Sequence, residues 1–250
     1  MGSLLTISIG ATAIADTLTE AVASYQSAMQ SSDRQERING FRRAELLFRK
    51  AIEDSGGAAN GDLYANLGTA CLSGEQIGPA IVAYRKALQL NPQHDQSRKN
   101  LTYARELLPS WARKSDSNSP LNIFRSNASA RLLRHTAGVC FVACCLMFGS
   151  AIYWRLGFLR MLAVFPLVAW LTIAIGLFAL KPNAVEAVVI RDDVIARSAD
   201  SHNSSQLFGG SLPSGAEVFV LEERGDWARI SLANKTAWIP RSAVEIVAGS

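Results

Sequence analysis

Residues 137–180 are almost entirely apolar, and their only charges lie in a short basic loop at residues 155–160. The loop separates two uncharged stretches, residues 137–154 and residues 161–180. A helix needs about 20 apolar residues to cross the ~30 Å hydrocarbon layer of a membrane. The block therefore predicts a two-helix transmembrane hairpin. A buried hairpin in a soluble core is the alternative, but two consecutive uncharged spans exceed what a small domain buries.

The rest of the chain has ordinary globular composition, so the hydrophobic content of 49% and the mean hydropathy of +0.13 reflect mainly this block. The net charge is +4. Many of the Lys and Arg residues lie beside the block, where lipid headgroups attract cations. We therefore expect membrane lipid as a partner, and we do not expect nucleic acid.

The basic residues around the block give conflicting indications of its orientation. Arg155 and Arg160 predict a cytoplasmic loop, and hence an inner-membrane, two-pass protein whose flanking domains are periplasmic. The basic residues before the first stretch indicate the opposite orientation: Arg113, Lys114, Arg125, Arg131 and Arg134. Both orientations stay open on this evidence.

The first fifteen residues form a short apolar run that ends in Ala13-Ile14-Ala15, directly before Asp16. Such a run with a small-residue end resembles a secretory signal peptide, which would favour export of the following domain. No Lys or Arg separates Met1 from the run. The alternatives are therefore a start that lies upstream or the opening turns of a helix.

Residues 17–108 show helical periodicity, with breaks at Gly56-Gly57, Gly74 and Pro92. Part of this region has the spacing of a tetratricopeptide repeat, carried by Tyr64, Leu67, Gly68, Cys71, Ala80, Tyr84, Ala87 and Pro92. In this pattern small residues let two helices approach closely, and a large aromatic residue fills the space between them.

One repeat cannot bury its own apolar face, so neighbouring repeats are expected. Ala44, Phe48 and Ala51 have the spacing of the second helix of a preceding repeat. Leu101 aligns with Leu67 at the period of about 34 residues. We therefore predict an all-α tetratricopeptide repeat domain over residues 17–108, followed by a polar linker at residues 109–136.

After residue 185 the apolar period changes to two, as in β-strands. The expected strands are residues 217–221, 227–230 and 236–240, separated by turn signals, and short strands at this spacing predict a small all-β barrel. Four segments resemble a bacterial SH3 domain: Ala196-Arg197-Ser198, Ser214-Gly215-Ala216, Gly225-Asp226-Trp227 and Ala237-Trp238-Ile239-Pro240. Thr236-Ala237 departs from the family pattern, which usually has Gly before Trp. We predict an SH3-like domain over residues 185–250.

No set of residues in the sequence resembles a catalytic or metal site. His94, His135 and His202 fall in three different regions, and we expect them to be surface groups. The segment Gly56–Gly61 lacks the Lys-Ser/Thr of a phosphate-binding loop, and there is no GxSxG or HExxH motif. The four cysteines, Cys71, Cys140, Cys144 and Cys145, form neither a disulfide framework nor a CxxC metal pair. We predict no enzyme activity, no catalytic residue, no metal and no cofactor.

Polar residues on the first helix of each repeat are the candidate protein-binding residues. Asn66 and Asn100 precede matching leucines, and an amide can both donate to and accept from a peptide backbone. Thr69, Lys99 and Tyr103 lie on the same predicted faces. The alternative is a solvated helix surface.

Trp227 and Trp238 are the candidate ligand-stacking residues of the SH3-like domain. Buried tryptophans are common in small β-domains, so we expect one of the two to belong to the core.

The order of the parts resembles BatE, the repeat protein of the bacterial aerotolerance (Bat) group. The most specific resemblance lies at residues 63–68, 77–81, 84–88 and 100–101, ahead of a paired membrane anchor and a terminal SH3-like domain. Membership would imply a cell-envelope assembly protein linked to aerotolerance or stress resistance. Its partners would be von Willebrand factor A membrane proteins and, indirectly, a MoxR-type ATPase, and the family supplies no catalytic residues.

The sequence thus predicts a multidomain membrane-anchored scaffold with a helical-repeat domain, a transmembrane hairpin and an SH3-like barrel. Two other classes stay open. A peptidoglycan-targeting membrane protein would act through the SH3-like domain. A membrane sensor would pass a signal through the hairpin to a sizeable cytoplasmic part.

Overall fold

The computed structural model describes residues 3–113, 127–153, 164–165, 167–174, 185–232 and 235–247. The chain forms two compact units. The first unit combines Met1–Lys114 with Ala184–Ser250, and the second contains Ser115–Asn183. The helical and β-regions, which lie at opposite ends of the sequence, therefore belong to one unit.

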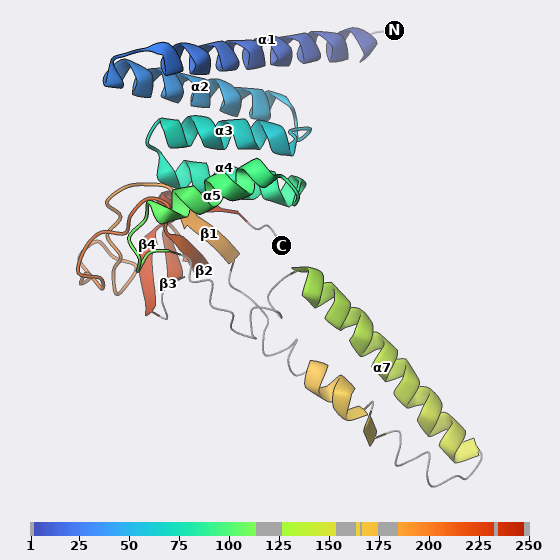
Figure 1. Ribbon diagram of the computed structural model, residues 1–250. Helices are drawn as coiled ribbons and strands as arrows, with labels where there is room; N and C mark the ends of the chain where they lie inside the picture. Colours follow the sequence, from blue (N-terminus) through green and yellow to red (C-terminus); the bar gives the residue numbers. More distant parts are fainter. Residues whose placement is uncertain are drawn as a thin grey trace. The chain divides into compact units, whose positions relative to one another are not determined.

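The N-terminal part of the first unit is a stack of helices in which each packs against the next along the chain (Figure 1). The helices are α1 (Ser3–Gln30), α2 (Arg34–Asp54), α3 (Gly61–Ser73), α4 (Ile77–Leu90) and α5 (Asp95–Glu106). Helix α1 includes residues 3–15, the segment that resembles a signal peptide, without a break.

Side-chain caps define where three of these helices begin. Asp33 accepts a hydrogen bond from the backbone N of Glu36 at 2.8 Å, and Asn60 accepts one from Leu63 N at 2.9 Å. His94 plays the same role through Nδ1, which accepts from Ser97 N at 3.0 Å. Each cap satisfies a backbone donor that has no partner within its helix.

The core between α3 and α4 depends on one close contact. A Cβ added to Gly68 would lie 2.7 Å from two ring atoms of Tyr84, so only a glycine lets this ring lie against α3. Tyr84, Cys71, Ala80 and Ala87 are fully buried. The residues whose spacing predicts a repeat therefore form the contact between α3 and α4.

The C-terminal part of the first unit is an antiparallel sheet, which in the described residues has five strands in the order β4-β3-β2-β1-β5. The strands are β1 (Val185–Val189), β2 (Glu217–Arg224), β3 (Trp227–Leu232), β4 (Lys235–Pro240) and β5 (Val244–Ile246), with a 3₁₀ turn η1 (Arg241–Ala243) before β5. Buried and half-buried residues alternate along β3, as the period of two predicts. Gly225, at φ +54°, makes the tight turn between β2 and β3.

The second unit contains α7 (Asn127–Tyr153) and the described residues 164–165 and 167–174. In it, the rings of Phe141 and Trp170 lie 5.6 Å apart. Among the described residues no helix combines the length and the apolar character needed to cross a membrane. The predicted transmembrane hairpin, the fold class that contains it and the two-pass inner-membrane location are therefore wrong.

The physical reason lies in the helix that contains the first expected span. Helix α7 is about 40 Å long, but it begins ahead of the apolar stretch and carries Arg131, Arg134 and His135 in its first half. In the second expected span the structure describes residues 164–165 and 167–174, which are helical. The predicted loop at residues 155–160 lies outside the described residues.

The expected linker begins at Pro109, but ordered packing continues past this residue. Ala112 is fully buried in the core of the sheet, and the ring of Trp111 stacks on Phe208 with centroids 6.4 Å apart. Residues 114–126 of the expected linker lie outside the described residues.

Candidate functional site

A surface pocket lies on the sheet beside Trp227. Its volume is about 270 Å³, and a second hollow of about 600 Å³ adjoins it. His202, Trp227 and Pro240 line both. The pocket is therefore built from one long loop and from the facing ends of β3 and β4.

The strand register brings Trp227 and Pro240 together. Trp227, the first residue of β3, pairs with Pro240, the last residue of β4. Arg241 N donates to Asp226 O at 2.8 Å, which holds the chain beyond Pro240 against the β2–β3 turn. The pocket wall thus follows directly from the antiparallel pairing.

The long loop places His202 against Trp227, with ring centroids 4.9 Å apart and ring planes at 60°. Arg197 anchors this loop, because its backbone N and O exchange two hydrogen bonds of 2.8 Å with Trp238. The Arg197 guanidinium also donates to Ser204 O at 2.8 Å. His202 is exposed, as expected of a surface group, and its ring also lines the pocket.

The two predicted tryptophans have different environments. Trp227 is half-buried and has a face toward the pocket. Trp238 is only 9% exposed, and the Arg224 guanidinium lies 5.1 Å from its ring centroid. Trp227 can therefore stack on a ligand. Trp238 is covered, but its β4 neighbours Ala237 and Ile239, and not Trp238 itself, belong to the core of the sheet.

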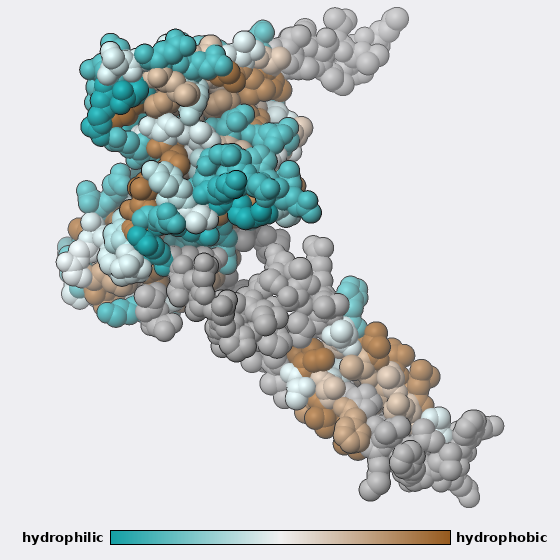
Figure 2. All heavy atoms as spheres, viewed as in Figure 1, coloured by the Kyte–Doolittle hydropathy of each residue, from teal (hydrophilic) through white to brown (hydrophobic). Residues whose placement is uncertain are grey.

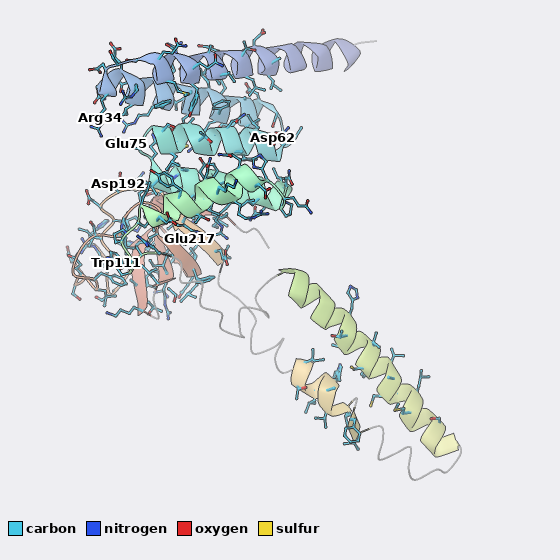
Figure 3. The ribbon with its side chains drawn as sticks, in the orientation of Figure 1. Arg34, Asp62, Glu75, Trp111, Asp192 and Glu217 are labelled. Atoms are coloured by element: carbon cyan, nitrogen blue, oxygen red, sulfur yellow. The ribbon has the colours of Figure 1, made fainter. Side chains whose placement is uncertain are left out.

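The pocket carries charges of both signs around its aromatic wall. Arg191, Asp192 and Asp226 are exposed, and Figure 3 labels Asp192 in the loop that follows β1. The Arg241 guanidinium is held by Glu223 at 2.6 Å. Such a surface can bind a peptide by stacking, by hydrogen bonds and by ion pairs.

The predicted residues of the helical surface divide into two groups. Asn66, Lys99 and Tyr103 are exposed, and Tyr103 is 56% accessible. Thr69 and Asn100 are half-buried. Figure 2 shows that the face over α5 is largely hydrophilic.

Tyr84 connects the half-buried pair. Its hydroxyl donates to Thr69 Oγ1 and accepts from Asn100 Nδ2, both at 3.2 Å. Gln96 Nε2 donates to Asn100 Oδ1 at 3.0 Å. Burial raises the pKa of Tyr84, and these two hydrogen bonds oppose the shift. The Asn100 amide is therefore used inside the fold, whereas Asn66 presents its amide to solvent.

His94 also has a role that the sequence pattern did not indicate. Its Nδ1 caps α5, and its Nε2 lies 3.1 Å from Asp62 Oδ1 at the start of α3 (Figure 3). Only its position just before a helical segment could have suggested the cap. In the part of the chain that the structure describes, no group of three or more His, Cys, Asp or Glu side chains is placed to hold a metal ion.

Comparison with known families identifies the region around the pocket. Residues 192–245 match the model of the bacterial SH3 domain. The match includes the His202 loop, Trp227, Trp238 and Pro240. No curated protein and no solved structure matches the chain. A bacterial SH3 domain therefore lies at residues 192–245, and the resemblance to BatE stays a prediction.

Proposed function

We propose that this protein is a non-enzymatic scaffold that binds partner proteins through two surfaces. One surface is the Trp227 pocket of the bacterial SH3 domain, and the other is the polar face of α3 and α5. The observation that carries the proposal is the aromatic pocket formed by His202, Trp227 and Pro240 within the matched segment.

The composition of the pocket suits peptide binding. Tryptophan contributes a large, rigid apolar area at a low cost in side-chain entropy, and it is enriched among residues that dominate binding energy. Asp192, Asp226 and Arg191 surround the ring and supply polar contacts that can select a ligand. Protein or peptidoglycan peptides are the ligand classes that a bacterial SH3 domain suggests.

The helical surface is the second proposed site. Asn66 and Tyr103 are exposed on α3 and α5, and Lys99 adds a cation. Amide, phenol and ammonium groups recognise peptide backbone and acidic side chains. The residue spacing of α3 and α4 supports its assignment as a tetratricopeptide repeat surface.

The resemblance of residues 63–108 to BatE supports a more specific partner set. In this proposal, the scaffold belongs to a Bat/MoxR-type complex and binds von Willebrand factor A proteins, which link it to a MoxR-type ATPase. Affinity capture with tagged full-length chain tests this assignment. Capture of neither protein under conditions that preserve Bat complexes would contradict it.

Peptidoglycan is the alternative ligand of the Trp227 pocket. The family match supports it as a second candidate, because the bacterial SH3 domain is compatible with wall binding as well as with protein binding. In that case the protein targets the cell wall, and the helical surface alone binds protein partners.

The experiment compares Trp227→Ala with Trp111→Ala in the full chain. Trp111 is a matched control, because it is 47% exposed and does not line the pocket. Capture of von Willebrand factor A protein and sedimentation with purified peptidoglycan are measured in parallel. We expect Trp227→Ala, but not Trp111→Ala, to weaken one of them by about tenfold or more. Equal binding by both variants and the wild type, in both assays, would refute the pocket as a ligand site.

A further inference from the structure

The sheet contacts the helical stack through one face of α4. Gly78, Ile81, Arg85 and Gln89 recur at intervals of three or four residues, so they share this face. A Cβ added to Gly78 would lie 2.5 Å from both Ser214 Oγ and Val189 O. A Cβ added to Gly215, at φ +102°, would lie 3.0–3.2 Å from Ile77, Leu108 and Ile81. Two glycines thus let the helix and the turn before β2 touch.

Glu217 at the start of β2 lies at the centre of this contact. Its side chain is 4% exposed and accepts from Arg105 Nε at 2.8 Å and from Arg105 Nη2 at 2.9 Å. Arg85 Nη1 donates to it at 3.1 Å, and Arg85 also pairs with Glu186 on β1. Figure 3 shows Glu217 where α5 meets the sheet. Two carboxylates and two guanidinium groups therefore form a charge-balanced cluster.

Further contacts extend on both sides of the cluster. Lys86 Nζ pairs with Glu245 at 2.6 Å, and Gln89 Nε2 donates to Val247 O at 2.6 Å. Val188 and Val247 belong to the same apolar core as the buried residues of the helices. Ala112, which follows α5, lies in the core of the sheet.

A stack of helical hairpins needs a cap at each end, because its terminal helices would otherwise expose an apolar face. Here the face of α4 and the end of α5 that a further helix would cover are covered by the sheet. A buried carboxylate such as Glu217 requires both of its arginines, since an unpaired buried charge is strongly destabilising. The docked position is therefore specified by charge as well as by shape.

We infer that the sheet is the C-terminal cap of the helical stack and that Glu217 is the residue that positions it. The consequence for binding rests on the proposed function. The Trp227 pocket and the exposed residues of α3 and α5 belong to one cooperative body, so a partner meets them at a fixed separation. The face of the sheet around Glu186, Glu217 and Glu245 is occupied within the chain and does not bind a partner.

The test is hydrogen exchange of the full chain, measured by mass spectrometry on peptides that cover β1 and β2. The variant is Arg105→Ala, which lies on α5, far from these strands in sequence. The control is Arg98→Ala on the same helix, whose guanidinium bonds to exposed groups, Asp95 at 2.5 Å and Pro92 O at 2.7 Å. Arg105→Lys is a milder variant that keeps the charge and loses the two-pronged contact.

We expect Arg105→Ala to accelerate hydrogen exchange in β1 and β2 by at least about tenfold. Arg105→Lys should have a smaller effect in the same peptides. Arg98→Ala should leave the exchange rates of these peptides within about twofold of the wild type. Wild-type exchange of β1 and β2 in every variant would overturn the inference, and so would equal acceleration by Arg98→Ala. If Arg105→Ala does not fold, the Arg105→Lys comparison decides. Because the measurement needs no ligand, its outcome is independent of the pull-down and sedimentation results.

Discussion

Replacing Gly78 by Ala tests the helix–sheet contact by adding one methyl group. The new Cβ would lie 2.5 Å from Ser214 Oγ, 2.5 Å from Val189 O and 3.0 Å from Gly215 N. Two of these three atoms are backbone atoms, which no rotamer change can move. Overpacking of this kind costs about 1–3 kcal/mol. Alanine gains up to about 1 kcal/mol over glycine inside a helix, and less in the first turn, where Gly78 lies.

The net expectation is a loss of about 1–2 kcal/mol in the free energy of unfolding of the first unit. Urea denaturation of the full chain, followed by far-ultraviolet circular dichroism and by tryptophan fluorescence, measures it. Adding Ser214→Gly removes the hydroxyl contact but leaves Val189 O in place, so the double variant should recover only part of the loss. A Gly78→Ala protein as stable as the wild type, or more stable, would show that α4 and the turn before β2 do not touch.

Three further expectations concern the helical stack. Burial raises the pKa of Tyr84, so the neutral phenol contributes stability below the ordinary pKa of about 10, and this contribution is lost as pH rises through the folded-state pKa. Denaturation between about pH 8 and about pH 11 should show this alkaline loss in the wild type and a smaller loss in Tyr84→Phe. Asp33→Ala should lower the free energy of unfolding by about 1 kcal/mol through loss of the α2 cap, whereas Ser32→Ala next to it should change little; equal midpoints in thermal denaturation would contradict this. Burial raises the pKa of Cys71, so maleimide should label it in urea but not in the native protein, and rapid native labelling would place it at the surface.

The sequence predicted the strands around the aromatic pocket but not which tryptophan faces the pocket. The expected strands at residues 217–221, 227–230 and 236–240 lie within β2, β3 and β4, because alternating burial is written in a strand's own residues. That Trp227, rather than Trp238, faces the pocket depends on the pairing of β3 with β4 and on the loop that carries His202. The local sequences around Trp227 and Trp238 are too similar to show which of the two faces the pocket.

The apolar block shows the opposite case, in which a strong local signal led to a wrong conclusion. The apolar block predicted two spans because the count was made over the two uncharged stretches, residues 137–154 and 161–180. Helix α7 begins ten residues before this block and includes basic side chains. Counting only the uncharged residues therefore overestimated the apolar character of the helix that contains them.

By itself, the sequence determined the properties that depend on neighbours a few residues apart. Helical periodicity and the Gly68–Tyr84 spacing act within one helix or one helical pair. Only the tertiary structure decided that the sheet closes the helical stack. The ion pair between Arg105 and Glu217 joins residues that are 112 positions apart, with the whole second unit between them. No periodicity or motif encodes such a pair, because its energy exists only after both modules have folded and buried the carboxylate between two guanidinium groups.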